Sequence, residues 1–461
     1  MKLVPYPEYK DTGQPWVGRI PVHWELFRNG RLFAQRNETG HGDLPILEVS
    51  LRTGVRIRDM DNLKRKQMMS DREKYKRAAQ GDIAYNMMRL WQGAVGVAPV
   101  DGLVSPAYVV VRPFSGVDCR YFTYLFRTNC YMNEVDGYSR GIVKDRNRLY
   151  WQDFKRMPSV VPPVIEQCHV ARFLDAVGSN IQRFLRNKRR LIELLKEQRQ
   201  NIINQAVTRG LNPNVKLKPS GVEWIGEIPE HWEIRRAKYI LQEKDIRWKE
   251  NIGNLLMVSQ YTGTTKRPLR EDSEELDTRS GSLAGYKVVK KSELVINIML
   301  AWNGSIGVSH EDGVVRPAYC VYRFRDRGYP WYFHHLLRSL PYREEIKCRS
   351  RGVIESRLRL YSEDLFRIPL IEPPYDEQKL IVDFIETETA STNSAILRTE
   401  REIELMREYR TRLISDVVTG KVDVRGIEVP EIPDDEPLVL DGELSEADDM
   451  IDDEGNMDEN D

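Results

Sequence analysis

Two stretches of this chain nearly coincide: Trp16-Val17-Gly18-Arg19-Ile20-Pro21-Val22-His23-Trp24-Glu25 and, 208 positions later, Trp224-Ile225-Gly226-Glu227-Ile228-Pro229-Glu230-His231-Trp232-Glu233. A period of this length is far above the roughly 20–50 residues of a solenoid repeat, so it marks a whole domain with its connector. The sequence therefore predicts two similar modules on one chain, which perform one task at two places.

A second set of matches keeps one offset of 211 over about 90 positions, which chance does not explain. The matched segments pair as follows: Tyr75-Lys76 with Tyr286-Lys287, Pro106-Ala107-Tyr108 with Pro317-Ala318-Tyr319, Ser139-Arg140-Gly141 with Ser350-Arg351-Gly352, Arg148-Leu149-Tyr150 with Arg359-Leu360-Tyr361, Pro162-Pro163 with Pro373-Pro374, and Glu166-Gln167 with Glu377-Gln378. The repeat therefore extends through most of the chain.

The length and composition indicate a globular protein of several domains. A chain of 461 residues with 41% hydrophobic residues and nine Trp can build more than one core. No apolar run approaches the roughly 18 residues of a membrane span, and the first residues lack the apolar region of a signal peptide. Five scattered cysteines without a Cys-x-x-Cys pair are typical of reduced thiols, which favours a cytoplasmic location.

The net charge of zero hides a strong asymmetry. Residues 427–461 contain 16 acidic residues and neither Lys nor Arg, so the remainder carries 70 basic and 54 acidic residues, a balance of +16. A basic body suggests a polyanionic partner, with nucleic acid the first candidate. A merely mildly basic surface is the alternative. The acidic tail at 427–461 lacks periodicity and is expected to be disordered.

Each copy divides into a globular part and a long helix. The globular parts, residues 1–163 and 219–374, contain short apolar runs bounded by Gly and Pro, which predict strands at Ala94–Ala98 and Tyr108–Val111. Short helices are predicted at Tyr121–Cys130 and Trp331–Leu340. The sequence thus favours an α+β fold for both globular parts, which we treat as domains.

Long helices are predicted at 164–210 and 375–421, with residues 211–218 as a linker between the copies. Apolar residues recur with spacings of 7, 3, 7 and 4 in both helices, which predicts one stripe along each and an antiparallel coiled coil between them. The stripe residues are Leu185, Ile192, Leu195, Ile202 and Ala206, matched by Ile396, Ile403, Met406, Leu413 and Val417. Arg199 and Arg410 interrupt both stripes at one position, where they either set the register, face a partner or lie at a solvated edge. Gly178-Ser179 predicts a break in the first helix. By the pseudo-twofold relation, the N-terminal strand should return to the end of the second helix.

These features together resemble the specificity subunit of type I restriction–modification systems. The resemblance rests on the double Trp-x-Gly-x-Ile-Pro-x-His-Trp-Glu box, the Pro-Pro-x-x-Glu-Gln entry to a long helix, and the repeated domain–helix layout, and it covers about residues 5–420. It implies that each globular part is a target recognition domain that reads one half of a split DNA site. It also implies that the helices set the spacer and dock the partner subunits.

The same resemblance implies the partners and cofactors. Double-stranded DNA, two modification (methyltransferase) subunits and ATP-dependent restriction subunits would assemble around this chain. S-adenosylmethionine, ATP and Mg²⁺ would be bound by those partners, and none by this chain.

Basic residues gather in two places in each copy, where they could neutralise phosphates. The first cluster follows the strand-like Leu44–Ser50 and consists of Arg52, Arg56, Arg58, Lys64, Arg65 and Lys66, with Lys266, Arg267 and Arg270 in the second copy. The second cluster consists of Arg140, Lys144, Arg146 and Arg148, with Arg349, Arg351, Arg357 and Arg359 in the second copy. Positions that differ between copies are candidates for base contacts, and matched positions are candidates for structure or phosphate contact.

Catalytic signatures are missing from the sequence. There is no phosphate-binding Gly-x-x-x-x-Gly-Lys-Ser/Thr loop and no His-Glu-x-x-His metal motif. Glu372-Pro373-Pro374-Tyr375 resembles an amino-methyltransferase loop, but Glu is the wrong residue there, and a stiff strand-to-helix junction explains the prolines better. The repeated Trp residues predict core packing, and His23 and His231 predict buried hydrogen-bonded side chains.

The main hypothesis is a non-catalytic recognition subunit. The alternatives are a methyltransferase or nuclease with a divergent site, and a helical scaffold.

Overall fold

The computed structural model describes residues 3–51, 53–58, 72–141, 147–249, 254–260, 262–267, 283–325, 328–354 and 357–429. The chain divides into two compact units, residues 1–189 with 400–461 (unit 1) and residues 190–399 (unit 2). Each unit therefore contains one globular part and one half of each long helix. The predicted acidic tail lies outside the described residues from position 430 onward.

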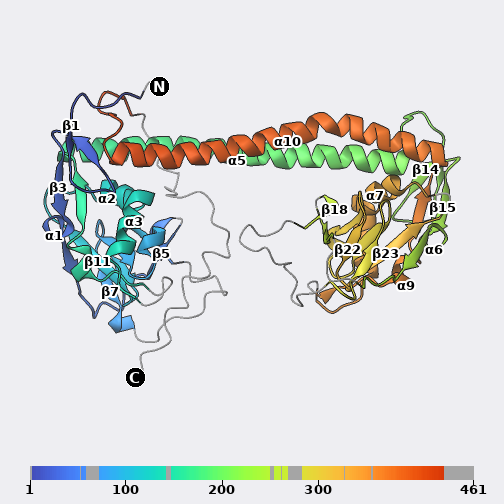
Figure 1. The fold of residues 1–461 in the computed structure, drawn as a ribbon, viewed down its shortest axis with the longest axis horizontal. Helices are drawn as coiled ribbons and strands as arrows, with labels where there is room; N and C mark the ends of the chain where they lie inside the picture. The colour runs from blue at the N-terminus through green and yellow to red at the C-terminus, as the bar shows by residue number, and fades with distance from the viewer. Residues whose placement is uncertain are drawn as a thin grey trace. The chain divides into compact units, whose positions relative to one another are not determined.

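Unit 1 is built around an antiparallel sheet in the order β4-β11-β8-β9 (Figure 1). Its strands are β4 (Phe33–Arg36), β11 (Tyr108–Pro113), β8 (Ile83–Asn86) and β9 (Val95–Val97). Four antiparallel pairs surround it: β1 (Tyr9–Asp11) with β2 (Arg19–Pro21), β3 (Glu25–Arg28) with β12 (Pro158–Val161), β5 (Leu47–Ser50) with β6 (Gly54–Ile57), and β7 (Lys76–Ala78) with β10 (Gly102–Val104). The predicted strands at 94–98 and 108–111 are thereby confirmed.

Both faces of this sheet are covered, which explains why β8 is buried at every position. Alternate residues such as Tyr85 and Val111 face the large core beneath helix α2 (Cys119–Phe126). Their neighbours Ala84 and Val110 pack instead with Val55 of the β5–β6 hairpin. Because successive side chains of a strand point to opposite faces, one sheet serves two cores.

The helices of unit 1 differ from the prediction at one point. The expected helix Tyr121–Cys130 is two helices, α2 and α3 (Asn129–Tyr138). The Thr128 side chain accepts a hydrogen bond from the Tyr131 backbone N–H and so caps α3, which begins a new helix there. The remaining short elements are α1 (Asn29–Leu32), α4 (Trp151–Phe154), and the single-turn η1 (Arg72–Lys74) and η2 (Leu90–Gln92).

Unit 2 repeats this architecture, so the predicted α+β internal repeat is confirmed. Its sheet runs β16 (Leu241–Lys244), β23 (Tyr319–Phe324), β20 (Leu294–Asn297), β21 (Ile306–Val308). Its strand pairs are β13 (Leu217–Pro219) with β14 (Glu227–Pro229), β15 (Glu233–Arg236) with β24 (Pro369–Glu372), β17 (Leu256–Ser259) with β18 (Gly263–Lys266), and β19 (Lys287–Val289) with β22 (Gly313–Val315). Its short helices are α6 (Ala237–Ile240), η4 (Ala301–Asn303), α7 (Pro330–Arg338), α8 (Leu340–Arg349) and α9 (Ser362–Leu365).

The long helices are α5 (Val164–Arg209) and α10 (Tyr375–Val418). In unit 1 the start of α5 packs with the end of α10, where Val170 and Val417 share one core. In unit 2 the end of α5 packs with the start of α10, where Val207 and Ile381 share another. The helices are therefore antiparallel within each unit, as the heptads predict (Figure 1).

Two details of the helices differ from the sequence-based expectations. Helix α5 continues through Gly178-Ser179, so the predicted break is wrong, because burial of the neighbouring residues Ala176 and Ile181 outweighs the low helix propensity of Gly. Arg199 donates to Asn393 Oδ1 on α10 at 2.9 Å, which favours the register-setting alternative at this position. The matching Arg410 is buried at 8% exposure.

The repeated motifs join each long helix to its globular part. In unit 1 the Glu166 carboxylate accepts from Tyr6 Oη at 2.5 Å and Trp24 Nε1 at 3.0 Å, and contacts His23 Nε2 at 2.9 Å. Gln167 donates to the Pro162 carbonyl oxygen at 2.8 Å. Trp24 is fully buried, as predicted, whereas the His23 side chain is 40% exposed, so the prediction of a buried histidine is wrong.

In unit 2 the same motif connects the long helix to the globular part with fewer hydrogen bonds. Glu377 contacts His231 Nε2 at 2.7 Å, and Gln378 donates to the Pro373 carbonyl oxygen at 2.8 Å. His231 is half exposed, which again differs from the prediction. In both units the Pro-Pro pair separates the last strand from the long helix, as expected of a stiff junction.

The N-terminal segment returns to the end of α10, as the pseudo-twofold relation predicts. Val4 forms a β-bridge with Asp423, and the Asp423 backbone N–H donates to the Val4 carbonyl oxygen at 2.8 Å. The Tyr121 hydroxyl donates to the Val418 carbonyl oxygen at 3.0 Å, and Tyr332 makes the matching bond to Val207 at 3.0 Å in unit 2.

Candidate nucleic-acid interface

Three loops meet at one edge of the sheet in each unit. In unit 1 they are the described residues of the β5–β6 turn, the segment around η2, and the loop ends at Arg140 and Arg148. Residues 52 and 142–146 lie outside the described residues. Arg140 and Arg148 form a two-way backbone bridge at 3.0 and 2.9 Å, and the Leu149 N–H donates to the Met87 carbonyl oxygen at 2.9 Å. We call these three loops the loop rim. The corresponding loops of unit 2 carry the same bridge between Arg351 and Arg359.

In each unit, the guanidinium of one arginine connects two segments of the loop rim by hydrogen bonds to their carbonyl oxygens. The Arg127 guanidinium donates to the carbonyl oxygens of Gly93 at 2.8 Å and Val95 at 3.1 Å, and also to that of Leu51. It therefore joins the η2 segment to the β5–β6 turn. Because a guanidinium presents five donors in a fixed plane, it can bind several carbonyl groups that a lysine could not.

Arg338 does the same in unit 2 and binds one more carbonyl group among those described. It donates to the carbonyl oxygens of Gly304 at 3.0 Å, Ile306 at 2.7 Å, Ser259 at 3.3 Å and Gln260 at 3.0 Å. Burial lowers the pKa of Arg338 to about 10, since desolvation disfavours the charged form. The guanidinium remains a cation at neutral pH and holds both loops.

Glycines allow the hairpin to approach the sheet closely. A Cβ atom on Gly96 would lie 2.4 Å from the Val55 backbone nitrogen, and a Cβ atom on Gly307 would lie 2.6 Å from the Gly263 Cα. Such separations are too short for any side chain, so both positions require Gly. The hairpin is thus attached to β9 or β21 through main-chain contact.

Two matched members of the predicted basic clusters have structural partners. Arg140 pairs with the buried Asp153 at 2.5 Å, and Arg351 pairs with the buried Asp364 at 2.7 Å. These ion pairs connect the base of each Arg140–Arg148 or Arg351–Arg359 loop to the following short helix. Ion pairing also raises the pKa of Arg351.

The other described residues of the predicted basic clusters differ in their pairing. Several of them, namely Arg56, Arg58, Lys266 and Arg267, lie towards the ends of β6 and β18 that are farthest from the hairpin turns of the loop rim. Arg56 pairs with Glu48 at 2.5 Å, Lys266 pairs with Glu311 at 3.2 Å, and Arg349 pairs with Glu345. Arg58 and Arg267 follow β6 and β18, and their backbone N–H groups donate to Ile46 and Leu255. Arg148, Arg357 and Arg359 are exposed, and among the described residues no carboxylate pairs with them. The remaining predicted residues lie outside the described residues: Arg52, Lys64, Arg65, Lys66, Lys144, Arg146 and Arg270.

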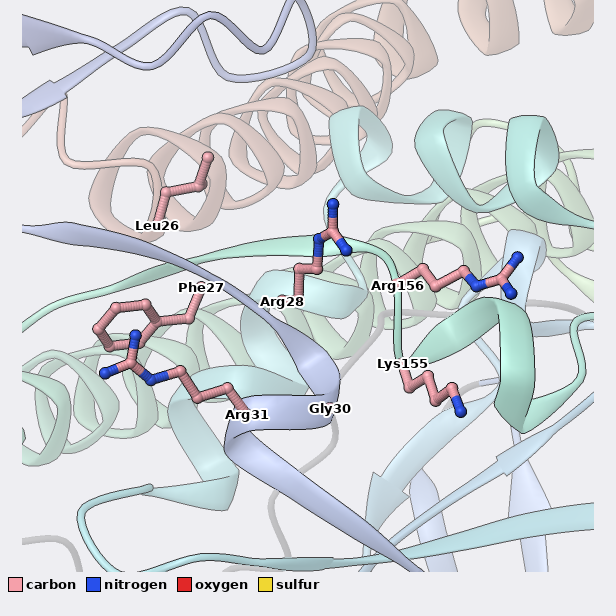
Figure 2. Close-up of a pocket in the computed structure, with 7 residues that line it drawn as sticks. All are labelled: Leu26, Phe27, Arg28, Gly30, Arg31, Lys155 and Arg156. Carbon is pink, nitrogen blue, oxygen red and sulfur yellow. The ribbon is translucent and has the colours of Figure 1, made fainter.

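A separate basic hollow lies in unit 1 between the β3–α1 turn and the end of α4 (Figure 2). Four cations line it, namely Arg28, Arg31, Lys155 and Arg156. The Arg31 guanidinium lies over the Phe27 ring at 4.1 Å from its centroid. Unit 2 places Tyr239 and Phe366 at the positions of Arg31 and Lys155, so two of the four cations are not repeated in the second copy.

Features of metal or redox sites are not found in the part of the chain that the structure describes. No group of three His, Cys, Asp or Glu there could hold a metal ion, and all five cysteines are free. Desolvation by burial lowers the pKa of His334 and lowers that of His335 to about 4, so both imidazoles are neutral. No helix among the described residues is long and apolar enough to cross a membrane.

Comparison with known proteins agrees with this architecture. The chain is 28% identical over 110 residues to the Escherichia coli EcoKI type I restriction enzyme specificity subunit, which covers 24% of this chain and 22% of that protein. It is 22% identical over 293 residues to the Methanocaldococcus jannaschii MjaVIII specificity subunit, which covers 59% of this chain and 64% of that protein. The chain thus spans less than two thirds of the length of these relatives. No family model matches it.

A solved chain from work on complex assembly and conformational transition of the type I restriction–modification system matches 87% of this chain and 98% of its own length. The TM-score is 0.63 at 13% sequence identity, so this likeness concerns the fold. The chain shares its fold with that solved chain. The resemblance inferred from the Trp boxes and the helix entries is thereby confirmed.

Sequence reasoning missed the two arginines that organise the loop rim. Arg127 and Arg338 are related by the same offset of 211 as the motifs, yet they lie in segments predicted simply as helices. The matched offset was the available signal. A basic residue that recurs within an otherwise apolar helix, such as α2–α3 or α7, indicates a buried charge with several acceptors.

Proposed function

We propose that this chain is the DNA sequence-specificity subunit of a type I restriction–modification complex. Unit 1 reads one half of a split site and unit 2 reads the other, each through its loop rim. The observation that carries the proposal is the repeat of one rim architecture, Arg127 in one copy and Arg338 in the other, under loops whose exposed residues differ. Similar relatives named specificity subunits support it.

The differences between the rims fit two unlike half-sites. Arg89 and Gln92 of the η2 segment correspond to Leu300 and Asn303 in unit 2. Arg binds guanine edges, whereas Leu contacts only apolar groups such as the thymine methyl, so the pair Arg89 and Leu300 fits different bases. Gln92 and Asn303 both suit adenine. The exposed Arg148 and Arg359 are matched, which suits contact with phosphates that every sequence shares.

The long helices are proposed to set the spacer and to dock modification and restriction subunits. Their outward faces carry exposed apolar residues that neither unit covers, namely Leu191 at 41%, Leu194 at 45%, Leu397 at 67% and Leu405 at 47% exposure. Exposed leucines in a row along a helix are typical of a surface that packs against another helix. The partners would carry S-adenosylmethionine, ATP and Mg²⁺, and the complex would act in the cytoplasm.

The test measures binding of the full chain, together with the modification subunit from the same host, to a pool of random duplexes. We expect enrichment of a split motif, and exchange of residues 1–163 for the segment of a relative should change one half of it. Binding of all duplexes with equal affinity at every salt concentration would refute the proposal.

Matched substitutions separate phosphate contact from base reading. Arg148→Gln and Arg359→Gln should each weaken binding to all sequences and reduce the slope of log affinity against log salt by about one. Lys216→Gln, on an exposed segment before β13, is the control and should leave both unchanged. A relaxed motif in place of a uniform loss would assign the arginine to base reading.

Catalysis by this chain alone is the competing reading. Incubation of the purified chain with a labelled methyl donor and DNA should give no methylation, and addition of the modification subunit should restore it. Turnover without the partner would overturn the assignment to a non-catalytic subunit.

A further inference from the structure

The loop between Arg351 and Arg359, which is part of the loop rim of unit 2, carries two exposed apolar side chains. Val353 is 102% exposed and Ile354 is 51% exposed, although both are β-branched residues that normally pack in a core. The next two residues, Glu355 and Ser356, lie outside the described residues. Val353 is therefore held in solvent, with no neighbour to cover it among the residues that the structure describes.

The base of this loop is firmly fixed. Arg351 and Arg359 exchange two backbone hydrogen bonds at 2.9 and 3.0 Å, and Arg351 is clamped by Asp364 at 2.7 Å. The Leu360 N–H donates to the Ile298 carbonyl oxygen at 2.9 Å, which attaches the returning arm to the segment before η4. Val353 and Ile354 thus project from a hydrogen-bonded loop base that is part of the loop rim.

The loop is also narrow. A Cβ atom on Gly352 would lie 2.7 Å from the Arg357 carbonyl oxygen, so the two arms touch at this point and only Gly fits. The Arg357 N–H donates to the Ile354 carbonyl oxygen at 2.8 Å, which is a second contact between the two arms. Two apolar side chains at the end of a narrow arm form a compact tip, which we define as Val353 and Ile354.

Cations flank the tip. Arg357 and Arg359 are exposed on the returning arm, without an ion pair to any described carboxylate. Arg349 and Arg351 precede it on the outgoing arm. An apolar tip beside two unpaired arginines is complementary to duplex DNA, which has negative phosphates along its groove walls and apolar base faces that become accessible where a base step opens. A protein partner would have to bury the arginines as well, which favours DNA as the occupant.

We propose that the Val353–Ile354 tip inserts as a wedge between two adjacent base pairs in the second half-site and partly unstacks them, while Arg357 and Arg359 hold the flanking phosphates. This inference rests on the proposed DNA-recognition function and deepens it. Proteins that kink duplexes insert apolar side chains between base steps in this manner. Stiff β-branched side chains suit the role because they lose little rotamer freedom on insertion.

The first copy repeats the pattern in sequence. Ser139-Arg140-Gly141-Ile142-Val143 matches Ser350-Arg351-Gly352-Val353-Ile354, with the two apolar residues in reverse order. Arg140 and Arg148 form the same backbone bridge and Arg140 the same aspartate clamp as their partners in unit 2. Retention of an apolar pair at the same place in both copies, beside a matched base, indicates a shared contact that does not read sequence.

The experiment uses the full chain with its modification subunit and a duplex selected by the wild-type complex from a random pool. 2-Aminopurine is placed at successive positions of the second half-site. Unstacking by the wild-type tip should raise its fluorescence severalfold at one step. Val353→Ser with Ile354→Ser keeps every charge and should abolish that rise and weaken binding about tenfold, with the salt dependence unchanged.

The controls distinguish the possible failures. Leu217→Ser, which changes a 39% exposed leucine of β13, should leave fluorescence and affinity as in the wild type. If the wild-type complex shows no sequence preference, the proposed function fails. If it binds specifically but the double variant retains full affinity and signal, the wedge is wrong and the recognition function stands. Weaker binding without any fluorescence rise in the wild type would also overturn the wedge, because it assigns the tip to a groove wall. Circular dichroism of the double variant checks that the fold is intact.

Discussion

The two units share every strand pair of the fold, but they differ in how the same motif is bonded. In unit 1 the buried Glu166 binds Tyr6, His23 and Trp24, and the segment after α10 covers it. In unit 2 Glu377 has a side chain 27% exposed and binds His231, and Trp232 Nε1 has no hydrogen-bond partner among the described residues. Asn214 replaces Tyr6 at this joint. The matched Glu and His residues therefore connect the long helix to the globular part in both units, whereas the number of hydrogen bonds at this connection depends on the neighbouring residues.

The largest expected effect comes from removal of the arginine below one loop rim. Arg338→Met should leave four carbonyl groups without their cationic donor and destabilise unit 2 by about 3 kcal/mol. Hydrogen exchange read by mass spectrometry should increase in β17, β18 and η4. Arg127→Met should produce the corresponding change in β5, β6 and η2, with unit 2 unaffected. Equal changes in both units for either variant would contradict separate support of the two rims.

A second substitution tests the difference between the joints. Glu166→Ala leaves the Tyr6 hydroxyl and Trp24 indole N–H buried without an acceptor, so unit 1 should lose about 2–3 kcal/mol of stability. Glu377→Ala removes one partly exposed contact and should cost less than about 1 kcal/mol. Urea unfolding of the two variants, followed by tryptophan fluorescence, measures both values. Similar losses would show that the extra bonds of Glu166 contribute nothing.

Lowering the pH should destabilise unit 2 more than unit 1. Burial lowers the pKa of His335 to about 4, below the value of about 6.5 in an unfolded chain. The unfolded state therefore binds the proton first, so this contribution to stability is complete above about pH 6.5 and is lost as the pH falls towards 4. The loss should be roughly 1–3 kcal/mol in unit 2. Unit 1 has Thr123 and Tyr124 at the positions of His334 and His335 and should lack it. Hydrogen exchange at pH 7 and pH 5 compares the units, and His335→Phe should reduce the difference, while the buried His334 accounts for the remainder.

The smallest effect concerns the long helices. A Cβ atom added to Gly178, within α5, would have no neighbouring atom within 4 Å, while the counterpart Thr389 in α10 is buried. Gly178→Ala should stabilise unit 1 by about 0.5–1 kcal/mol, because it restricts the unfolded chain and favours the helix. Thermal unfolding should show a correspondingly higher midpoint. A lower midpoint would mean that the helix bends at this glycine.

The sequence predicts the features that depend on repetition and periodicity. The offset of 211 yields the duplicated sheet, and the heptad spacing yields the antiparallel helices, because both are regular patterns. The roles of individual arginines could not be predicted in this way. Arg140 and Arg148 are equally basic in the sequence and both are exposed, yet Arg140 pairs with Asp153, whereas no described carboxylate pairs with Arg148. That distinction depends on which carboxylate the fold brings near, and Asp153 lies 13 positions away, within a short helix.

The close contact of Gly96 with the β5–β6 hairpin, and of Gly307 with the β17–β18 hairpin, bears on how the proposed recognition function changes during evolution. The hairpin is fastened by backbone atoms and by the arginine beneath it, so its attachment is indifferent to the side chains at its tip. Substitutions in the turn of each hairpin can then accumulate without disturbing the core. Under the proposed function, each unit can change its recognised half-site independently of the other. Duplication followed by independent divergence of the two units is a natural outcome of this anchoring.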